Sequence, residues 1–169
     1  MIQKNNPMKE QIFNSSMGVG AYLITLIAFI IVAYTAYIYL PKMGSLWSIA
    51  IFALAAIAFL LVPYILNSRS YRLSDDALLI TRPIGHIRIP FDDISGVQSV
   101  RDAGFLRVFG VGGLWGWYGK FWNKNFGFVS MYAGNRKNFC LLNTKSRGAI
   151  ILSPDDSSMV DTIRNRIHI

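Results

Sequence analysis

Three pairs of adjacent aspartates are the first residues in this sequence that could carry out chemistry, because two close carboxylates can serve as general acid and base. They are Asp75-Asp76, Asp92-Asp93 and Asp155-Asp156. Adjacent side chains in a turn point apart, and each pair stands where a turn or a helix N-terminus is expected. We therefore expect structural rather than catalytic roles for all three pairs.

The other reactive side chains do not form a catalytic pattern either. Cys140 lies between Phe139 and Leu141 in a predicted strand, which is typical of an inert buried thiol. The two histidines, His86 on the outward face of a predicted strand and His168 near the end, lack the spacing of helical metal ligands. We expect no catalytic residue, no metal site and no cofactor, and hence a protein that is not an enzyme.

The segment FGVGGLWGWYGKFWNKNFG, residues 109–127, combines six glycines with seven aromatic residues. Glycine-rich loops can hold phosphates, but Gly119-Lys120 is followed by Phe121 where a Walker motif needs Ser or Thr. The glycine spacing does not fit a dinucleotide fingerprint either. Three alternatives stay open: a strongly curved piece of core, an aromatic surface at the lipid headgroups, or a protein-interaction surface.

Two long runs, residues 21–40 and 46–66, contain no charged residue. Twenty helical residues rise about 30 Å, the thickness of the hydrocarbon core of a bilayer. The connection PKMGS is short enough to allow only an antiparallel hairpin. Neither run has a polar face, as a helix of a soluble protein would, and the first is too long for a signal peptide. We expect an N-terminal arm over residues 1–18 and a two-span transmembrane hairpin over 19–67.

Basic residues predict the orientation of this hairpin. Lys4 and Lys9 precede the first run, and four arginines follow the second, whereas the connecting turn holds only Lys42; the arginines are Arg69, Arg72, Arg82 and Arg88. Loops rich in Lys and Arg stay on the cytoplasmic side. We therefore expect both termini in the cytoplasm, on the inner face of the cytoplasmic membrane. Ala50, Ala53 and Ala56 are small enough to let the two helices approach closely.

The remaining residues, 68–169, change to the period of short strands. Seven strands are expected, at 71–74, 77–82, 86–91, 97–101, 127–133, 138–144 and 149–153. A final helix should follow, with Ser153 as N-cap, Pro154 at the first position and Asp156 completing a capping box. Its apolar stripe would cover a sheet or the open end of a barrel; the stripe is formed by Met159, Val160, Ile163 and Ile167.

Three stretches carry a resemblance to a known family: RVFGVGGLWGWYGKF (107–121), GFVSMYA (127–133) and ILSPDD (151–156). Together with the hairpin they resemble the bacterial pleckstrin-homology-like domains of small membrane proteins. The resemblance covers about residues 68–169. It implies a mainly-β, bent two-sheet barrel with a capping C-terminal helix, and a binding or assembly module at a membrane. Eukaryotic namesakes bind phosphoinositides through a basic first hairpin, but Asp75 and Asp76 stand there in this chain.

These features predict a membrane-anchored, non-enzymatic scaffold that binds a protein partner or a second copy of itself. The candidate surface is Trp115, Trp117, Tyr118, Lys120, Trp122 and Lys124.

Residues 101–147 hold eight lysines and arginines against one acid, and the chain carries a net charge of +8. The alternative is therefore a domain for an anionic lipid or small ligand, with contacts from Arg101, Arg107, Arg136 and Lys137. A subunit of a larger transporter or enzyme complex is a third option. Nucleic acid is not expected as a partner, because the hairpin confines the domain to a membrane.

Overall fold

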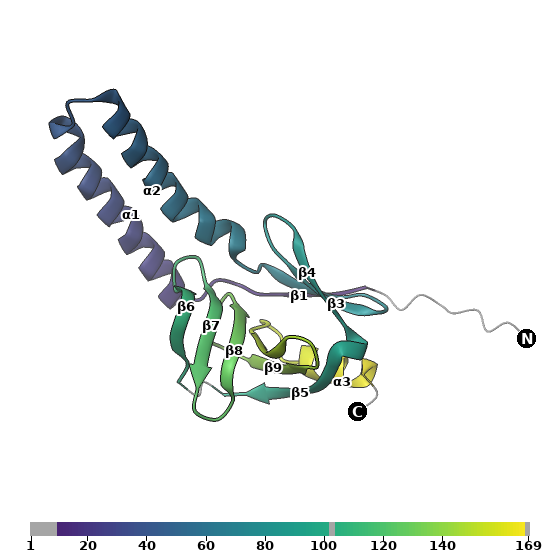
Figure 1. Cartoon of the computed structure of the whole chain (residues 1–169). Helices are drawn as coiled ribbons and strands as arrows, with labels where there is room; N and C mark the ends of the chain where they lie inside the picture. The colour runs from purple at the N-terminus through teal and green to yellow at the C-terminus, as the bar shows by residue number, and fades with distance from the viewer. Residues whose placement is uncertain (1–9, 102–103, 168–169) are drawn as a thin grey trace, which may run out of the picture.

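The chain folds into a long helical hairpin attached to a domain of two β-sheets (Figure 1). The computed structural model describes residues 10–101 and 104–167. In chain order the elements are β1 (Gln11–Asn14), α1 (Val19–Tyr39), η1 (Leu40–Lys42), α2 (Leu46–Leu66), β2 (Ser70–Leu73), β3 (Ala77–Thr81), β4 (His86–Pro90), η2 (Phe91–Asp93), β5 (Ile94–Val100), β6 (Leu106–Gly112), β7 (Trp117–Asn123), β8 (Gly127–Ala133), β9 (Phe139–Thr144), β10 (Gly148–Leu152) and α3 (Met159–Arg166).

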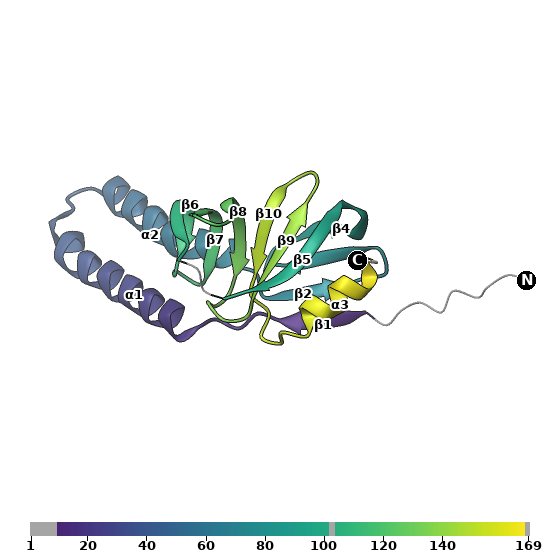
Figure 2. The same cartoon turned by 90° about the horizontal axis from the view of Figure 1, so that it is seen from below.

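The two long helices nearly coincide with the predicted spans and are long and apolar enough to cross a membrane. They leave the β domain together as an arm, and the two views show them apart from each other over most of their length (Figures 1 and 2). Ala50 and Ala53 of α2 are exposed and not covered by α1. The close approach of the two helices expected at Ala50, Ala53 and Ala56 is therefore wrong. Most apolar side chains of both helices therefore face outward, as a bilayer requires.

A strand that precedes the hairpin joins the sheet that follows it. β1 pairs antiparallel with β2, from Gln11 opposite Leu73 to Asn14 opposite Ser70. The arm expected over residues 1–18 is therefore wrong for Gln11–Asn14, which belong to the β domain, and Lys4 and Lys9 lie outside the described residues. Because β1 and β2 are neighbours, the chain enters and leaves the hairpin at the same place.

The four-stranded sheet has the order β1-β2-β3-β4, and the six-stranded sheet has the order β5-β9-β10-β8-β7-β6. The two sheets and α3 enclose the main apolar core, which includes Tyr71, Leu78, Ile80, Leu142, Ile150 and Met159. A second cluster holds Leu141 and Ile151, the chain neighbours of Leu142 and Ile150. Because side chains alternate between faces along a strand, both faces of the central strands β9 and β10 are buried.

The final helix has the predicted apolar face but not the predicted start. Met159, Val160 and Ile163 are buried, and α3 packs beside β5 (Figure 2). The helix begins at Met159, so the capping box at Ser153 is wrong. Ser153 is instead buried in the domain: its N–H donates to Tyr71 Oη at 3.0 Å, and its Oγ accepts from the backbone of Asn135 at 3.3 Å.

Candidate interaction site at the base of the hairpin

The glycine- and aromatic-rich segment 109–127 forms most of a β-hairpin that the sequence analysis did not predict. β6 and β7 pair antiparallel, with a bulge between Arg107 and Phe109, and β7 continues the sheet to β8. Glycines interrupt the alternation of side chains along both strands, which hid their period. The turn between β6 and β7, residues 113–116, lies against the two long helices α1 and α2.

Trp115 joins the turn to both helices. Its backbone N–H donates to Thr25 Oγ1 of α1, and its indole Nε1 donates to the carbonyl oxygen of Leu60 of α2, each at 3.0 Å. The indole also meets Phe29 of α1 and Tyr64 of α2 edge to face, with ring centroids 6.0 and 5.2 Å away. One side chain of the β domain thus contacts α1 and α2 at once, and the hairpin and the domain are connected through it.

Glycines on either side of Trp115 allow this close approach. A Cβ added to Gly113 would lie 2.3 Å from Cδ1 of Ile24, and one added to Gly116 would lie 2.6 Å from Oδ1 of Asn67. Trp115 itself has a φ of 61°, a left-handed conformation that costs a side-chain-bearing residue about 1 kcal/mol or more. Its contacts with the two helices offset that cost.

A polar network fixes the start of α1 to the same domain. The Asp155 carboxylate accepts hydrogen bonds from the Ser16 N–H, from Ser16 Oγ at 2.5 Å and from Asn135 Nδ2 at 3.1 Å. Ser15 is buried beside it, where its Oγ donates to the Ser153 carbonyl at 3.0 Å and accepts from Tyr71 Oη at 3.1 Å. Asp155 therefore joins the segment before α1 to the β domain, a role different from the helix N-terminus predicted for the pair Asp155-Asp156.

The predicted interaction residues divide between the interior and the surface. Trp115 is half-buried against the helices, and Tyr118 is 7% exposed; burial raises the pKa of its phenol. Trp117 is half-buried, with the Arg136 guanidinium 5.1 Å from its ring centroid. These three aromatic residues do not form the exposed surface that we expected. On the surface remain Lys120, whose Nζ donates to Ser130 Oγ at 2.7 Å, Trp122 and Lys124.

Five exposed apolar side chains, Trp122 among them, lie on β6, β7 and β8. Leu106, Trp122 and Phe128 are direct cross-strand neighbours and are 64%, 39% and 67% exposed. Val108 and Phe109, on the edge strand β6, have side chains that are 57% and 78% exposed. We call these five residues the β6–β8 patch. Of these five residues the sequence points only to Trp122, and the bulge in β6 disturbs the alternation at Leu106, Val108 and Phe109.

The predicted anion contacts do not form one cluster. Arg107 lines an apolar groove of about 590 Å³ between β6 and the helices. Arg136 and Lys137 line a different pocket of about 460 Å³ beside the first residues of α1. Arg101 is exposed at the end of β5, away from both. A third pocket of about 360 Å³, lined by Arg69 and Tyr64, flanks Trp115. All three pockets lie where the helical hairpin meets the β domain.

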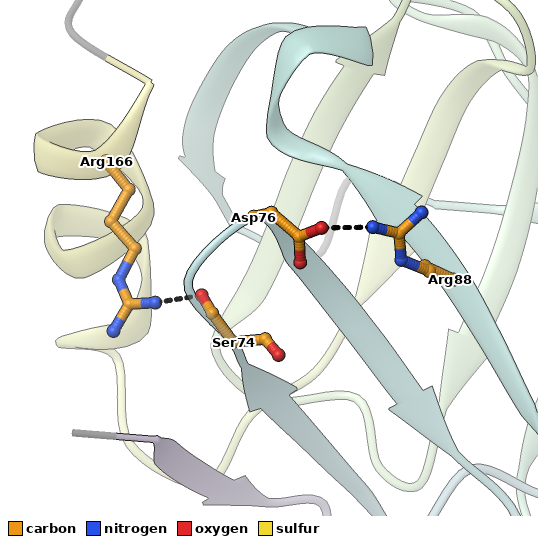
Figure 3. A network of polar contacts seen from close by, with 4 residues as sticks. All are labelled: Ser74, Asp76, Arg88 and Arg166. Atoms are coloured by element: carbon orange, nitrogen blue, oxygen red, sulfur yellow. Dashed lines mark hydrogen bonds and ion pairs between the residues drawn. The ribbon is translucent and has the colours of Figure 1, made fainter. Parts of the chain in front are cut away.

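The first hairpin of the domain, β2–β3, is held by internal polar contacts (Figure 3). The Arg166 guanidinium of α3 donates to the Ser74 carbonyl, and Arg88 of β4 pairs with Asp76. Both arginines point toward the turn between β2 and β3, where they meet oxygen atoms of the chain itself. This arrangement agrees with the sequence, which places acidic rather than basic residues at the tip of this turn.

The remaining reactive residues have structural surroundings. Cys140 is fully buried in β9, and burial raises the pKa of its thiol to about 12. Asp93 accepts from the Ser146 hydroxyl at 2.6 Å and from its N–H at 2.9 Å, and these bonds lower the carboxyl pKa. His86 is exposed, and His168 lies outside the described residues. Among the described residues, no three His, Cys, Asp or Glu side chains come together.

A family model described as Bacterial PH domain matches residues 69–167, which is more than half of the chain. The chain belongs to the bacterial PH domain family. The match runs from just before β2 to just after α3 and confirms both the suspected family and the predicted fold class. PH domains are in general non-catalytic interaction domains, so a bacterial PH domain with two apolar helices fits a membrane-associated binding protein. No curated protein and no solved structure matches the chain.

Proposed function

We propose that this bacterial PH domain protein is a membrane-anchored, non-enzymatic scaffold that holds another protein, or a second copy of itself, against the β6–β8 patch. Soluble surfaces rarely expose large contiguous apolar areas, and where they do, the area marks a protein or membrane contact. The observation that carries the proposal is the row Leu106, Trp122 and Phe128, in register on three adjacent strands and largely exposed.

The position of the row supports a protein rather than the bilayer as its main contact. Trp115 lies against the helices at one end of β6 and β7, and the strands run away from the helical hairpin toward the row (Figure 1). Trp122 is about 17 Å farther along β7 than Trp117, at about 3.3 Å per residue. A headgroup layer is only about 5–8 Å thick. A separation of this size exceeds the headgroup layer, and it favours contact of the row with water and proteins rather than with acyl chains.

The edge position of β6 supports the same proposal. β6 is the last strand of the six-stranded sheet, so one side of its backbone has no strand partner among the described residues. An exposed edge strand can pair with a strand of another chain, and apolar side chains then give specificity. A second copy of this chain offers the same edge and the same patch, which suits a symmetric dimer.

The anchoring of the domain supports an orientation with both termini in the cytoplasm. The β1–β2 pair places both ends of the hairpin in one sheet, which favours one side of the membrane for both. Arg69, Arg72, Arg82 and Arg88 follow α2, and the turn between the helices holds Lys42. The positive-inside rule then favours the cytoplasmic face of the inner membrane for the β domain.

The experiment uses the full-length chain, purified from membranes and reconstituted in neutral phosphatidylcholine nanodiscs. Mass measurement by light scattering at increasing concentration and moderate salt reports a second copy, and mass spectrometry reports a retained partner. Phe128→Glu introduces a charge into the row, and Ile84→Glu is a matched control at a 66% exposed apolar residue outside it.

The proposal predicts an oligomer or a stoichiometric partner that survives salt, persists in Ile84→Glu and is lost in Phe128→Glu. A chain that stays single and partner-free at every concentration would overturn it. So would a complex that Phe128→Glu leaves unchanged. Association with anionic vesicles that disappears as salt rises, without any protein complex, would favour the lipid-binding alternative instead.

A further inference from the structure

The groove of about 590 Å³ between β6 and the helices is built from α1, α2, β6, β7 and the turn between the two strands, which meet only in the folded chain. Its volume lies within the range of sites for small molecules, about 300–1,000 Å³. The helices supply small or apolar side chains, β6 and the turn after it supply Val111, Leu114 and backbone, and β7 adds Tyr118; the helical residues are Ile24, Ala28, Ala58, Phe59, Val62 and Pro63. The walls are therefore mainly hydrocarbon.

One cation interrupts these apolar walls. Of the described residues that line the groove, Arg107 is the only charged one, and its side chain is exposed. Among the described residues it has no ion-pair partner. A guanidinium presents several donors in one plane and suits a phosphate or carboxylate. The groove thus offers an apolar surface with a single site for an anion.

The groove also lies at the depth where lipids meet the hairpin. Ile24 is about 8 Å along α1 from its first residue, and Phe59 is about 10 Å from the last residue of α2, at 1.5 Å per residue. If the helices cross a bilayer, this part of the groove lies beside acyl chains, whereas Arg107 belongs to the β domain on the water side. A molecule with an acyl chain and an acidic headgroup matches both ends.

We infer that the groove binds one anionic phospholipid from the surrounding bilayer, with an acyl chain between the helices and β6 and the phosphate on Arg107. This site is separate from the β6–β8 patch and goes beyond the scaffold function proposed above. The lipid would fill the space beside the Trp115 turn and brace the β domain against the hairpin. Loss of the lipid and loss of the protein partner are measured with different variants, so either inference can fail alone.

The test measures the lipids that the full-length chain retains. The chain is reconstituted in nanodiscs of phosphatidylcholine with one-fifth phosphatidylglycerol, extracted into detergent and examined by native mass spectrometry. Arg107→Gln removes the cation, and Ala58→Phe places a ring in the apolar part of the groove. Lys124→Gln is the matched control, because it removes the same charge from an exposed residue outside all three pockets.

We expect the wild-type chain and Lys124→Gln to retain one phosphatidylglycerol. Arg107→Gln should lower its occupancy about tenfold relative to phosphatidylcholine, because a charge-assisted hydrogen bond is lost. Ala58→Phe should lower retention of both lipids. Retention unchanged in Arg107→Gln, or lowered equally in Lys124→Gln, would overturn the inference. Preferential binding of added oleate over phosphatidylglycerol would overturn the phospholipid assignment.

Discussion

Replacing Trp115 by alanine should release the β domain from the helical hairpin. The substitution removes the indole bond to the Leu60 carbonyl and the edge-to-face contacts with Phe29 and Tyr64, but keeps the left-handed backbone. A fully buried tryptophan costs about 3–5 kcal/mol on truncation. Because Trp115 is half-buried, we expect a cost of about 3 kcal/mol, most of it in the contact between the turn and the helices.

This cost can be measured as local opening. The amide of residue 115 donates to Thr25 Oγ1 of α1, and the amide of residue 113 donates to the Gly116 carbonyl within the turn that packs on the helices. A loss of about 3 kcal/mol should speed hydrogen exchange at these amides by about 100-fold, at tenfold per 1.4 kcal/mol. The assay is hydrogen exchange of the full-length chain in nanodiscs, read at the turn and in β9 and β10, where exchange should be unchanged.

Trp122→Ala is the matched control, because it removes the same side chain from the same β-hairpin at an exposed position. We expect it to change exchange at the turn by less than about threefold. If Trp115→Ala leaves exchange at residues 113 and 115 unchanged, or if Trp122→Ala speeds it equally, Trp115 does not hold the domain to the helices.

Three further predictions follow from the described contacts. Cys140 should resist maleimide in the folded chain and react on unfolding, because a pKa of about 12 instead of 9.0 lowers its thiolate fraction at pH 8 about 1,000-fold. For the same reason the thiol should contribute to a loss of stability as the pH rises from about 9 to 12. Alkaline unfolding curves of the wild-type chain and of Cys140→Ala would show this difference. Asp155→Asn should weaken the hold on Ser16 by about 1 kcal/mol and increase proteolysis at residues 15–18, whereas Asp161→Asn on the exposed face of α3 should not. Tags at the two termini should be accessible from the same side of sealed vesicles, and protection of only one tag would contradict the β1–β2 pairing in the membrane.

The parts of the fold that the sequence predicts are those with a strong local pattern. The uncharged runs of α1 and α2 and the alternating strand at Ile87 and Ile89 need no distant partner to be recognised. Ser153, Pro154 and Asp156 show the limit of such patterns, because they match a helix start in every local respect. The structure instead uses Ser153 to bond Tyr71 and Asn135, contacts that no local pattern contains.

The candidate site was less predictable because its contacts join segments far apart in the chain. Trp115 bonds Thr25 and Leu60, which are 90 and 55 residues away, so its exposure could not be read from the segment 109–127. β1 consists of four residues without a clear period, and only its pairing with β2 makes it a strand. A fragment that starts at Ser70 would lack β1, so tests of this domain need the full chain.

The most direct test of the scaffold proposal places a photo-reactive amino acid at position 128 of the full-length chain in its own membrane. The same amino acid at position 84 is the control, since Phe128 and Ile84 are 67% and 66% exposed. The proposal predicts a discrete protein adduct from position 128, either a second copy or one partner, and none from position 84. Adducts to lipid alone at position 128, or the same adducts at both positions, would contradict it.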